Sequence, residues 1–284
     1  MDRPLKETVY TPDSELLNFG ALLRNMGRDL LASRELAWRL LVRNISAQYR
    51  QSLLGYAWAF VPPIFTSLIW IFLQSQKVLG VGDTGMPYIL FVITGTVLWQ
   101  TFVEALHSPL QMVNESKSML TKINFPREAL ILAGLGQVLF NFAIRALLLV
   151  AVMLYFRISP HASLLLAPFG VLALIGLGMA IGLVLTPIGM LYHDVGRGLG
   201  FATAAWFFLT PVIYPVPKAS FAATLIELNP VTPLLVSTRE WLVVGEASLL
   251  PGFLWVSGLS LLLLMFAWVQ YRMAMPHLIS RMSA

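Results

Sequence analysis

Long apolar blocks separated by short polar segments dominate the chain. Six such blocks can be read along it: 53–75, 87–111, 129–156, 164–190, 199–214 and 249–271. A bilayer core about 30 Å thick needs about 20 consecutive apolar residues per helix. Within hydrocarbon every backbone amide must bond internally, so these blocks are expected to be helical. The pattern predicts an all-α integral membrane protein with six transmembrane helices, the fifth being the shortest.

The residues before the first block show an amphipathic pattern. Trp38, Leu41 and Ile45 recur at helical spacing, and Arg39 and Arg43 lie on the opposite face. This pattern predicts an amphipathic interface helix over residues 35–50, and a further helical stretch is expected over 14–31. Such a helix can simply anchor the chain, or it can meet a lipid-linked anionic substrate or a partner protein.

An unusual segment, residues 215–248, separates the fifth and sixth blocks. Its apolar stretches 219–228 and 233–244 are too short to cross a bilayer, and proline interrupts the chain between them, after Asn229 and after Thr232. This pattern predicts an outer re-entrant helical hairpin. A gate on a pathway and a packing plug are both compatible with it.

The loop between the second and third blocks carries a short apolar edge. Met119, Leu120 and Ile123 would share one side of a small helix that stops at Pro126. Such a helix can cap the bundle, or it can be a contact for a soluble motor domain.

Composition and charge agree with a membrane location. Apolar residues make up 57% of the 284 positions and charged residues 12%, roughly half of what a soluble domain carries. The net charge of +5 could suggest nucleic acid. However, of the 19 Lys and Arg, fourteen fall on one side of the predicted spans and four on the other, with Arg145 inside a span. Positive residues concentrate on the cytoplasmic side, so both termini are expected in the cytoplasm and no nucleic acid is implied.

The polar N-terminus has no apolar h-region, so no cleavable signal is expected. The chain has no cysteine and hence no disulfide or thiolate chemistry.

Aromatic residues form a row in the first block, where Trp58, Phe65 and Phe72 repeat every seven positions. The fifth block adds four more: Phe201, Trp206, Phe207 and Phe208. Lipid contact, packing or an interfacial belt can account for such residues. A row through the full membrane depth also offers flat faces over which sugar rings can slide.

Polar residues within the predicted spans are few. Arg145 is costly there unless it is paired or near water. Glu104 and His107 lie late in the second block. By position along antiparallel helices Glu104 and Arg145 fall at different depths, so the sequence does not pair them.

No catalytic or metal-binding pattern emerges. The chain has no Gly-x-x-x-x-Gly-Lys-Ser/Thr motif, and its four histidines show no metal-ligand spacing. Energy for transport would therefore come from a partner or from an ion gradient. An ion-coupled carrier usually has internal repeats and embedded acids, whereas Glu104 is the only carboxylate within a span.

Several ordered motifs carry a resemblance to a known family. Tyr49-Arg50-Gln51-Ser52-Leu53-Leu54-Gly55-Tyr56-Ala57-Trp58 with Pro62 resembles the entry to the first span of ABC-2-type exporter permeases of bacterial polysaccharides. The further matching motifs are Phe125-Pro126-Arg127-Glu128, Tyr192-His193-Asp194-Val195, Thr210-Pro211-Val212-Ile213-Tyr214-Pro215, Asn229-Pro230-Val231-Thr232-Pro233 and Arg239. The similarity runs from Arg28 to Arg272. Asn44 and His193 depart from the pattern, which puts their local contacts in doubt.

The resemblance implies a homodimer in the bacterial inner membrane. Its first and fifth spans would line a channel, with Trp58, Phe65, Phe72 and the fifth-span aromatics as the contacts for a lipid-linked polysaccharide. Residues 1–50 would be a cytoplasmic N-terminal region, 51–272 the transmembrane domain and 273–284 a cytoplasmic tail. The outer hairpin would be a periplasmic gate that includes Asn229, Pro230, Pro233 and Arg239.

The resemblance also implies two copies of a separate ATPase, which would hold ATP and Mg, so that this chain carries no cofactor. They would engage a coupling helix over 114–125, with contacts at Glu115, Lys117, Met119, Leu120, Lys122 and Ile123. The basic face of the interface helix predicts that Arg43 and Arg50 bind the lipid diphosphate. A drug or lipid exporter of the same architecture, or an enzyme of lipid-linked sugar metabolism, remain as alternatives.

Overall fold

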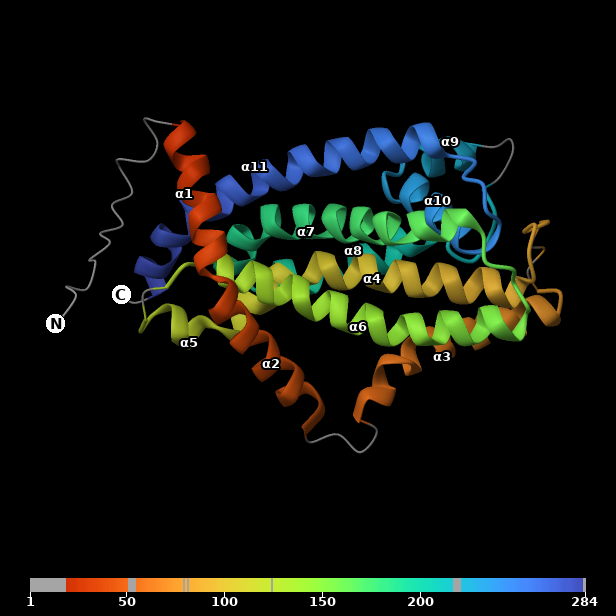
Figure 1. Ribbon diagram of the computed structural model, residues 1–284, viewed down its shortest axis with the longest axis horizontal. Coiled ribbons are helices and arrows are strands. Elements are labelled where there is room, and N and C mark those ends of the chain that lie inside the picture. The colour runs from red at the N-terminus through yellow and green to blue at the C-terminus, as the bar shows by residue number, and fades with distance from the viewer. Residues whose placement is uncertain are drawn as a thin grey trace.

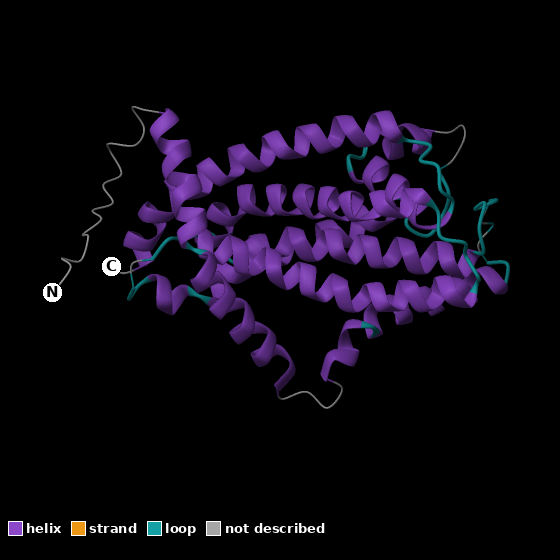
Figure 2. Cartoon of the chain, viewed as in Figure 1, coloured by secondary structure: helices purple, strands orange, loops and turns teal. Residues whose placement is uncertain are grey.

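The computed structural model describes residues 19–50, 55–78, 80, 82–123, 125–216 and 221–282. In these residues the chain folds into eleven α-helices and two 3-10 helices joined by loops, as Figure 2 shows. The all-α prediction is therefore confirmed. Four helical segments are long and apolar enough to cross a bilayer: α4 (Tyr88–Glu115), α6 (Glu128–Tyr155), the 3-10 helix η2 (Ala162–Leu166) with α7 (Ala167–Leu191), and α11 (Leu250–Met282).

The first and fifth predicted spans correspond to shorter helices. Helices α3 (Val61–Ser75) and α8 (Asp194–Phe208) have 15 residues each, which is about 22 Å at a rise of 1.5 Å per residue. Helix α3 begins with prolines in its first turn, where the missing N–H has no intrahelical partner to lose. A separate 3-10 helix, η1 (Gly55–Ala59), precedes it. The apolar block expected to start at 53 is thus divided, and its residues 53 and 54 lie outside the described part.

Helix α4 is the central helix of the bundle, since 78% of its most apolar window is buried. In Figure 1 it runs alongside α6 and α7, and α11 packs on the other side of α7. Close approach of α4 and α7 depends on glycine: a Cβ built at Gly178 or Gly182 would overlap backbone oxygens of Phe102 or Leu106. Small residues at such positions let membrane helices pack closely through their backbones.

The two N-terminal helices are α1 (Phe19–Ala32) and α2 (Arg34–Arg50). They meet at Ser33, whose Oγ donates a hydrogen bond to the Asp29 carbonyl (2.6 Å). Helix α2 packs on α6 and buries Ala37 and Leu40, whereas Trp38 is 65% exposed. The helix predicted over 35–50 is present as α2, but the side that meets the bundle is not centred on Trp38; its place at the membrane interface stays a prediction. Periodicity does not distinguish a face that meets protein from one that meets lipid.

Three short helices lie at the two ends of the bundle. Helix α5 (Lys117–Leu120) is one turn long, shorter than the helix expected over 114–125. At the opposite end (Figure 1), α9 (Phe221–Leu228) and α10 (Val231–Val243) match the two apolar stretches read from the sequence, with the break at Asn229 and Pro230. Helix α10 packs against α7, α4 and α11. Residues 217–220 of the predicted hairpin lie outside the described part. We call the two ends of the bundle the α5 end and the α10 end.

Candidate functional site

An aromatic surface extends over η1, α3 and α8. Trp58 in η1 is 52% exposed, and Phe65 and Phe72 in α3 are 66% and 62% exposed. On α8, Phe201 and Phe208 are likewise exposed. These side chains face away from the bundle, although Trp58 belongs to a different helix from Phe65 and Phe72. The seven-residue spacing therefore described one exposed side of the segment, but not a single continuous helix.

The other two α8 aromatics point inward. Trp206 meets Trp99 and Phe102 of α4 edge to face, with ring centroids 6.5 and 5.4 Å apart. Phe207 packs edge to face on Trp99 (5.9 Å) and stacks on Trp70 of α3 (6.3 Å). These contacts hold α3 and α8 against α4 and next to each other. Trp70 also meets the exposed Phe208 edge to face (6.2 Å), so α3 and α8 lie next to each other at these rings.

Asn229 joins the α9–α10 break to the end of α8. Its side-chain oxygen accepts hydrogen bonds from the Trp206 Nε1 (2.9 Å) and from the backbone N–H of Val231 (3.0 Å). Its Nδ2 donates to the Leu209 carbonyl (3.1 Å) and to the Thr210 Oγ1 (2.8 Å). The side chain is buried, so these four bonds satisfy polar groups that water cannot reach.

Arg239 of α10 makes a second connection to the same segment. Its guanidinium donates to the Pro211 carbonyl (3.0 Å), which lies where the chain has left α8, and sits 3.7 Å from the centre of the Phe91 ring. A buried cation is stable there because carbonyl dipoles and an aromatic face replace water. Pro230 caps the start of α10 and Pro233 is buried in its first turn. The four residues predicted for a gate thus lie together at the α10 end.

The loop at the α5 end is packed rather than free. Leu120 is buried, and Met119 packs beside it, in a cluster with Met275 and Leu278 of α11. The remaining predicted coupling residues are exposed or partly exposed: Glu115, Lys117, Lys122 and Ile123. The loop therefore presents charge and Ile123 outward, while Leu120 and Met119 pack in the cluster that includes α11.

An ion network that the sequence analysis missed links three helices at this end. Arg272 of α11 bonds to Glu128, the first residue of α6 (2.9 Å), and to Asp29 of α1 (2.8 Å). All three side chains are at most 14% exposed. Only the fold brings residues 29, 128 and 272 together, so no local spacing could have revealed the network.

Arg43 and Arg50, predicted to bind an anionic head group, are both exposed on α2. The Arg43 Nε donates to the neighbouring Asn44 Oδ1 (3.1 Å). Asn44 in turn contacts Met112 of α4 through its Nδ2 (3.4 Å to Sδ). Asn44 therefore holds α2 to the bundle, while the two arginines remain on the outer side of the helix.

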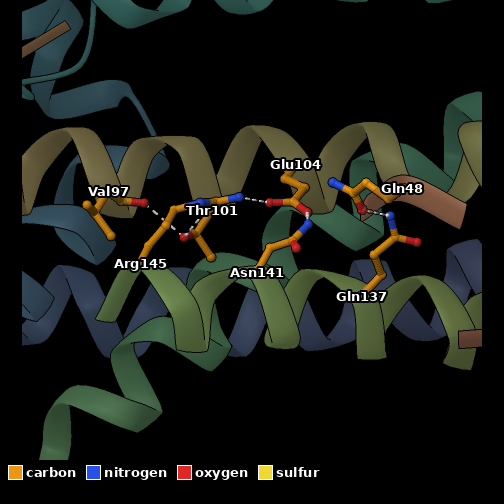
Figure 3. A network of polar contacts seen from close by, with 7 residues as sticks. All are labelled: Gln48, Val97, Thr101, Glu104, Gln137, Asn141 and Arg145. Carbon is orange, nitrogen blue, oxygen red and sulfur yellow. Dashed lines mark hydrogen bonds and ion pairs between the residues drawn. The ribbon is translucent and has the colours of Figure 1, made fainter. Parts of the chain in front are cut away.

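A polar network inside the bundle joins α4 and α6 (Figure 3). Arg145 pairs with Glu104, and Asn141 donates to the same carboxylate. Arg145 also donates to the Thr101 Oγ1 (3.3 Å). The expectation that Glu104 and Arg145 lie at different depths is therefore wrong. The pairing depends on the shift between the two helices and on the reach of the arginine, and sequence position fixes neither.

The network continues toward α2 along one side of α6. Gln137, Asn141 and Arg145 are four residues apart, so they share a helical face. Gln137 donates to Gln48 of α2 (3.2 Å), as Figure 3 shows. The polar stripe thus connects the amphipathic helix with the middle of the bundle. Among the described residues, no group of three or more His, Asp or Glu could hold a metal ion.

The fold and these surfaces define a helical membrane domain. Residues 35–242 match the model of the ABC-2 type transporter family, so the chain belongs to that family and is a transport subunit. Three curated relatives carry the name O-antigen export system permease protein RfbA. The one from Myxococcus xanthus is 27% identical over 213 residues, covering 74% of this chain and 81% of that protein. Two from Klebsiella pneumoniae are each 22% identical over 208 and 212 residues, covering 72% of this chain and 78% of those proteins.

Proposed function

We propose that this chain is the permease subunit of a bacterial exporter that moves a lipid-linked polysaccharide across the inner membrane. Two copies would pair through the side that carries α3 and α8, and the aromatic surface would line the channel. The shorter helices α3 and α8, with the residues next to them, would complete six spans. The name of the relatives supports the substrate class, and the family supports a role in transport.

The exposed rings of η1, α3 and α8 are the observation that carries this proposal. Aromatic faces bind the apolar faces of sugar rings without the strong charge that would trap a moving chain. Trp99 and Phe102 of α4 hold the inward rings Phe207 and Trp206 of α8, which positions the helix that carries Phe201 and Phe208. A second copy on the same side would convert an outward surface into an enclosed path.

The α5 end is proposed to face the cytoplasm and to bind two copies of a separate ATPase, which would hold ATP and Mg. The sequence has no nucleotide-binding P-loop of its own. The exposed charges of the α5 loop suit contact with a soluble protein, with the contacts at Glu115, Lys117, Lys122 and Ile123.

The α10 end is proposed to face the periplasm as a re-entrant gate. Asn229 and Arg239 bond to the segment that follows α8, so α9, α10 and the end of α8 would move as one unit. Movement of the channel-lining helix would then open the outer end. Arg43 and Arg50 would attract the lipid diphosphate, because exposed cations on an interfacial helix favour anionic head groups.

The proposal is tested by replacing Trp58, Phe65 and Phe72 with alanine in cells that lack the wild-type gene. Surface polysaccharide, measured by gel and antibody, is expected to fall about tenfold or more, because three ring contacts of about 1 kcal/mol each are lost. The control replaces Trp255 and Phe266 of α11, which are equally exposed but on another helix. That variant should export normally. Deletion of the gene with unchanged surface glycan and raised drug sensitivity would instead favour a drug exporter.

A further inference from the structure

The last helix extends well beyond what a bilayer requires. Helix α11 has 33 residues, or about 50 Å, against a hydrocarbon core of about 30 Å. Figure 1 shows its C-terminal end at the same end of the bundle as α5. Its final turns are not solvated on all sides: Met275 and Leu278 are buried in the cluster that contains Leu120. The end of α11 therefore supports the loop between α4 and α6.

Between these two elements lies a pocket of about 310 Å³. Its lining consists of four apolar side chains, one hydroxyl and two cations: Leu120, Ile123, Phe125, Ile279, Thr121, Lys122 and Arg127. Ile279 is the contribution of α11. The other residues come from the end of α5 and the segment that leads to α6, which together we call the α5 loop. We call this pocket the socket. It is at the small end of the range for ligand pockets, so it suits one or two side chains rather than a large ligand.

The lining limits what can fill the socket. An apolar group gains by leaving water in contact with the four apolar walls. Lys122 and Arg127 favour a negative charge beside it, and no carboxylate lines the pocket in the described residues. The matching occupant is an aliphatic or aromatic side chain next to Asp or Glu.

A protein partner fits this position better than a lipid. Helix α4 has 28 residues, about 42 Å, so the loop that follows it extends past the hydrocarbon core. A phosphate head group alone would meet the two cations but would leave the four apolar side chains in contact with water. The α5 loop is, moreover, the surface where the proposed function places the ATPase.

We propose that the end of α11 and the α5 loop form one composite docking socket, which receives an acid-flanked apolar side chain of the ATPase. This inference rests on the proposed function. It makes the C-terminal turns of α11 part of the coupling surface, although the sequence marks them only as a tail. Because Arg272, about two turns before Ile279 on α11, bonds to Glu128, force applied at the socket would reach α6 as well as α11.

The absence of cysteine from the chain permits a direct test with small substitutions. Single-cysteine variants Ile279→Cys, in the socket, and His277→Cys, exposed on the same helix outside it, are labelled with a maleimide in detergent. The probe is the ATPase that copurifies with the wild-type chain and carries its own P-loop. With ATPase at about ten times its dissociation constant, labelling at position 279 should slow about tenfold, because a bound site reacts only when vacant. Labelling at position 277 should not change.

Equal protection at both positions, or none at 279 while the ATPase stays bound, would overturn the socket and leave the proposed function standing. Slower labelling at 279 with phosphatidylglycerol vesicles alone would assign the socket to lipid and also overturn it. If the wild-type chain retains no ATPase at all, both proposals fail.

A second pair of variants tests binding itself. Ile279→Trp fills the socket, and His277→Trp adds the same ring on the exposed side. The first should weaken ATPase binding about tenfold, whereas the second should bind like the wild type, with both eluting as folded protein in size-exclusion chromatography. Unchanged affinity of Ile279→Trp would contradict the inference.

Discussion

At the scale of single residues, the chain places its costly polar groups where partners satisfy them. Arg145 and Glu104 neutralise each other inside the bundle, and Asn141 fills a further acceptor position on the carboxylate. Arg239 uses carbonyl groups and a ring for the same purpose. A charge within a bilayer is tolerated only with such compensation. These residues therefore fix the relative placement of the helices that carry them.

Breaking the Glu104–Arg145 pair from one side should destabilise the protein more than removing both charges. Glu104→Leu leaves Arg145 buried without its anion and should cost about 3–5 kcal/mol, whereas Glu104→Leu with Arg145→Leu should recover much of that loss. Thermal unfolding in detergent, followed by tryptophan fluorescence, measures the difference.

The matched control is Glu35→Leu, which removes an acid from the Glu35–Arg39 pair, where both side chains are 74% exposed. It should change stability by no more than about 1 kcal/mol. A double variant as unstable as Glu104→Leu alone would show that the two charges do not compensate each other.

At the scale of helices, close packing and hydrogen bonds between segments determine which helices are held together. The α4–α7 contact depends on glycine, which removes the side chain that would hold the two backbones apart. The segment after α8 depends on α10 instead, since Asn229 and Arg239 bond to its backbone carbonyl groups. The first contact makes a rigid centre, and the second joins a short helical pair to the end of the helix that carries Phe201 and Phe208.

Two substitutions in α7 should test how far the α4–α7 contact depends on glycine. Gly182→Val forces a side chain into the Leu106 backbone and should destabilise the protein by about 1–3 kcal/mol or more. Gly176 lies on the same helix with nothing within 4 Å of a built Cβ, so Gly176→Val should be nearly neutral. Thermal unfolding of the two variants side by side gives the comparison; equal loss at both positions would show that the α4–α7 contact does not set the cost.

At the scale of the whole molecule, the two ends of the bundle differ in chemistry. The α5 end carries Lys117 and Lys122, the Arg272 network and the socket, and the α10 end carries the short helices and their bonds to α8. Excess positive charge marks the cytoplasmic side of membrane proteins. The α5 end is therefore expected to face the cytoplasm.

This orientation is testable by cysteine labelling, again because the native chain has none. In spheroplasts an impermeant maleimide should label Glu246→Cys at the α10 end. Ser118→Cys in α5 and Ser280→Cys near the end of α11 should react only after lysis. Labelling of Ser118→Cys in intact spheroplasts would reverse the topology and remove the basis for an ATPase at that end.

Local patterns in the sequence were enough to predict the class of fold and the order of its main helices. Apolar blocks long enough for a bilayer predict α4, α6, α7 and α11, because hydrocarbon forces such blocks into helices. The amphipathic period before residue 50 predicts α2, and Asn229-Pro230 predicts the break between α9 and α10. Each of these signals is local, since it depends on the spacing of residues along one segment.

Which of these residues contact one another depends on the tertiary structure. The division of the first block into η1 and α3, the inward direction of Trp206 and Phe207, and the pairing of Glu104 with Arg145 depend on neighbours far along the chain. The network of Asp29, Glu128 and Arg272 and the socket at Ile279 are of the same kind. The shift and rotation of packed helices determine such contacts, and hydrophobic periodicity leaves both free.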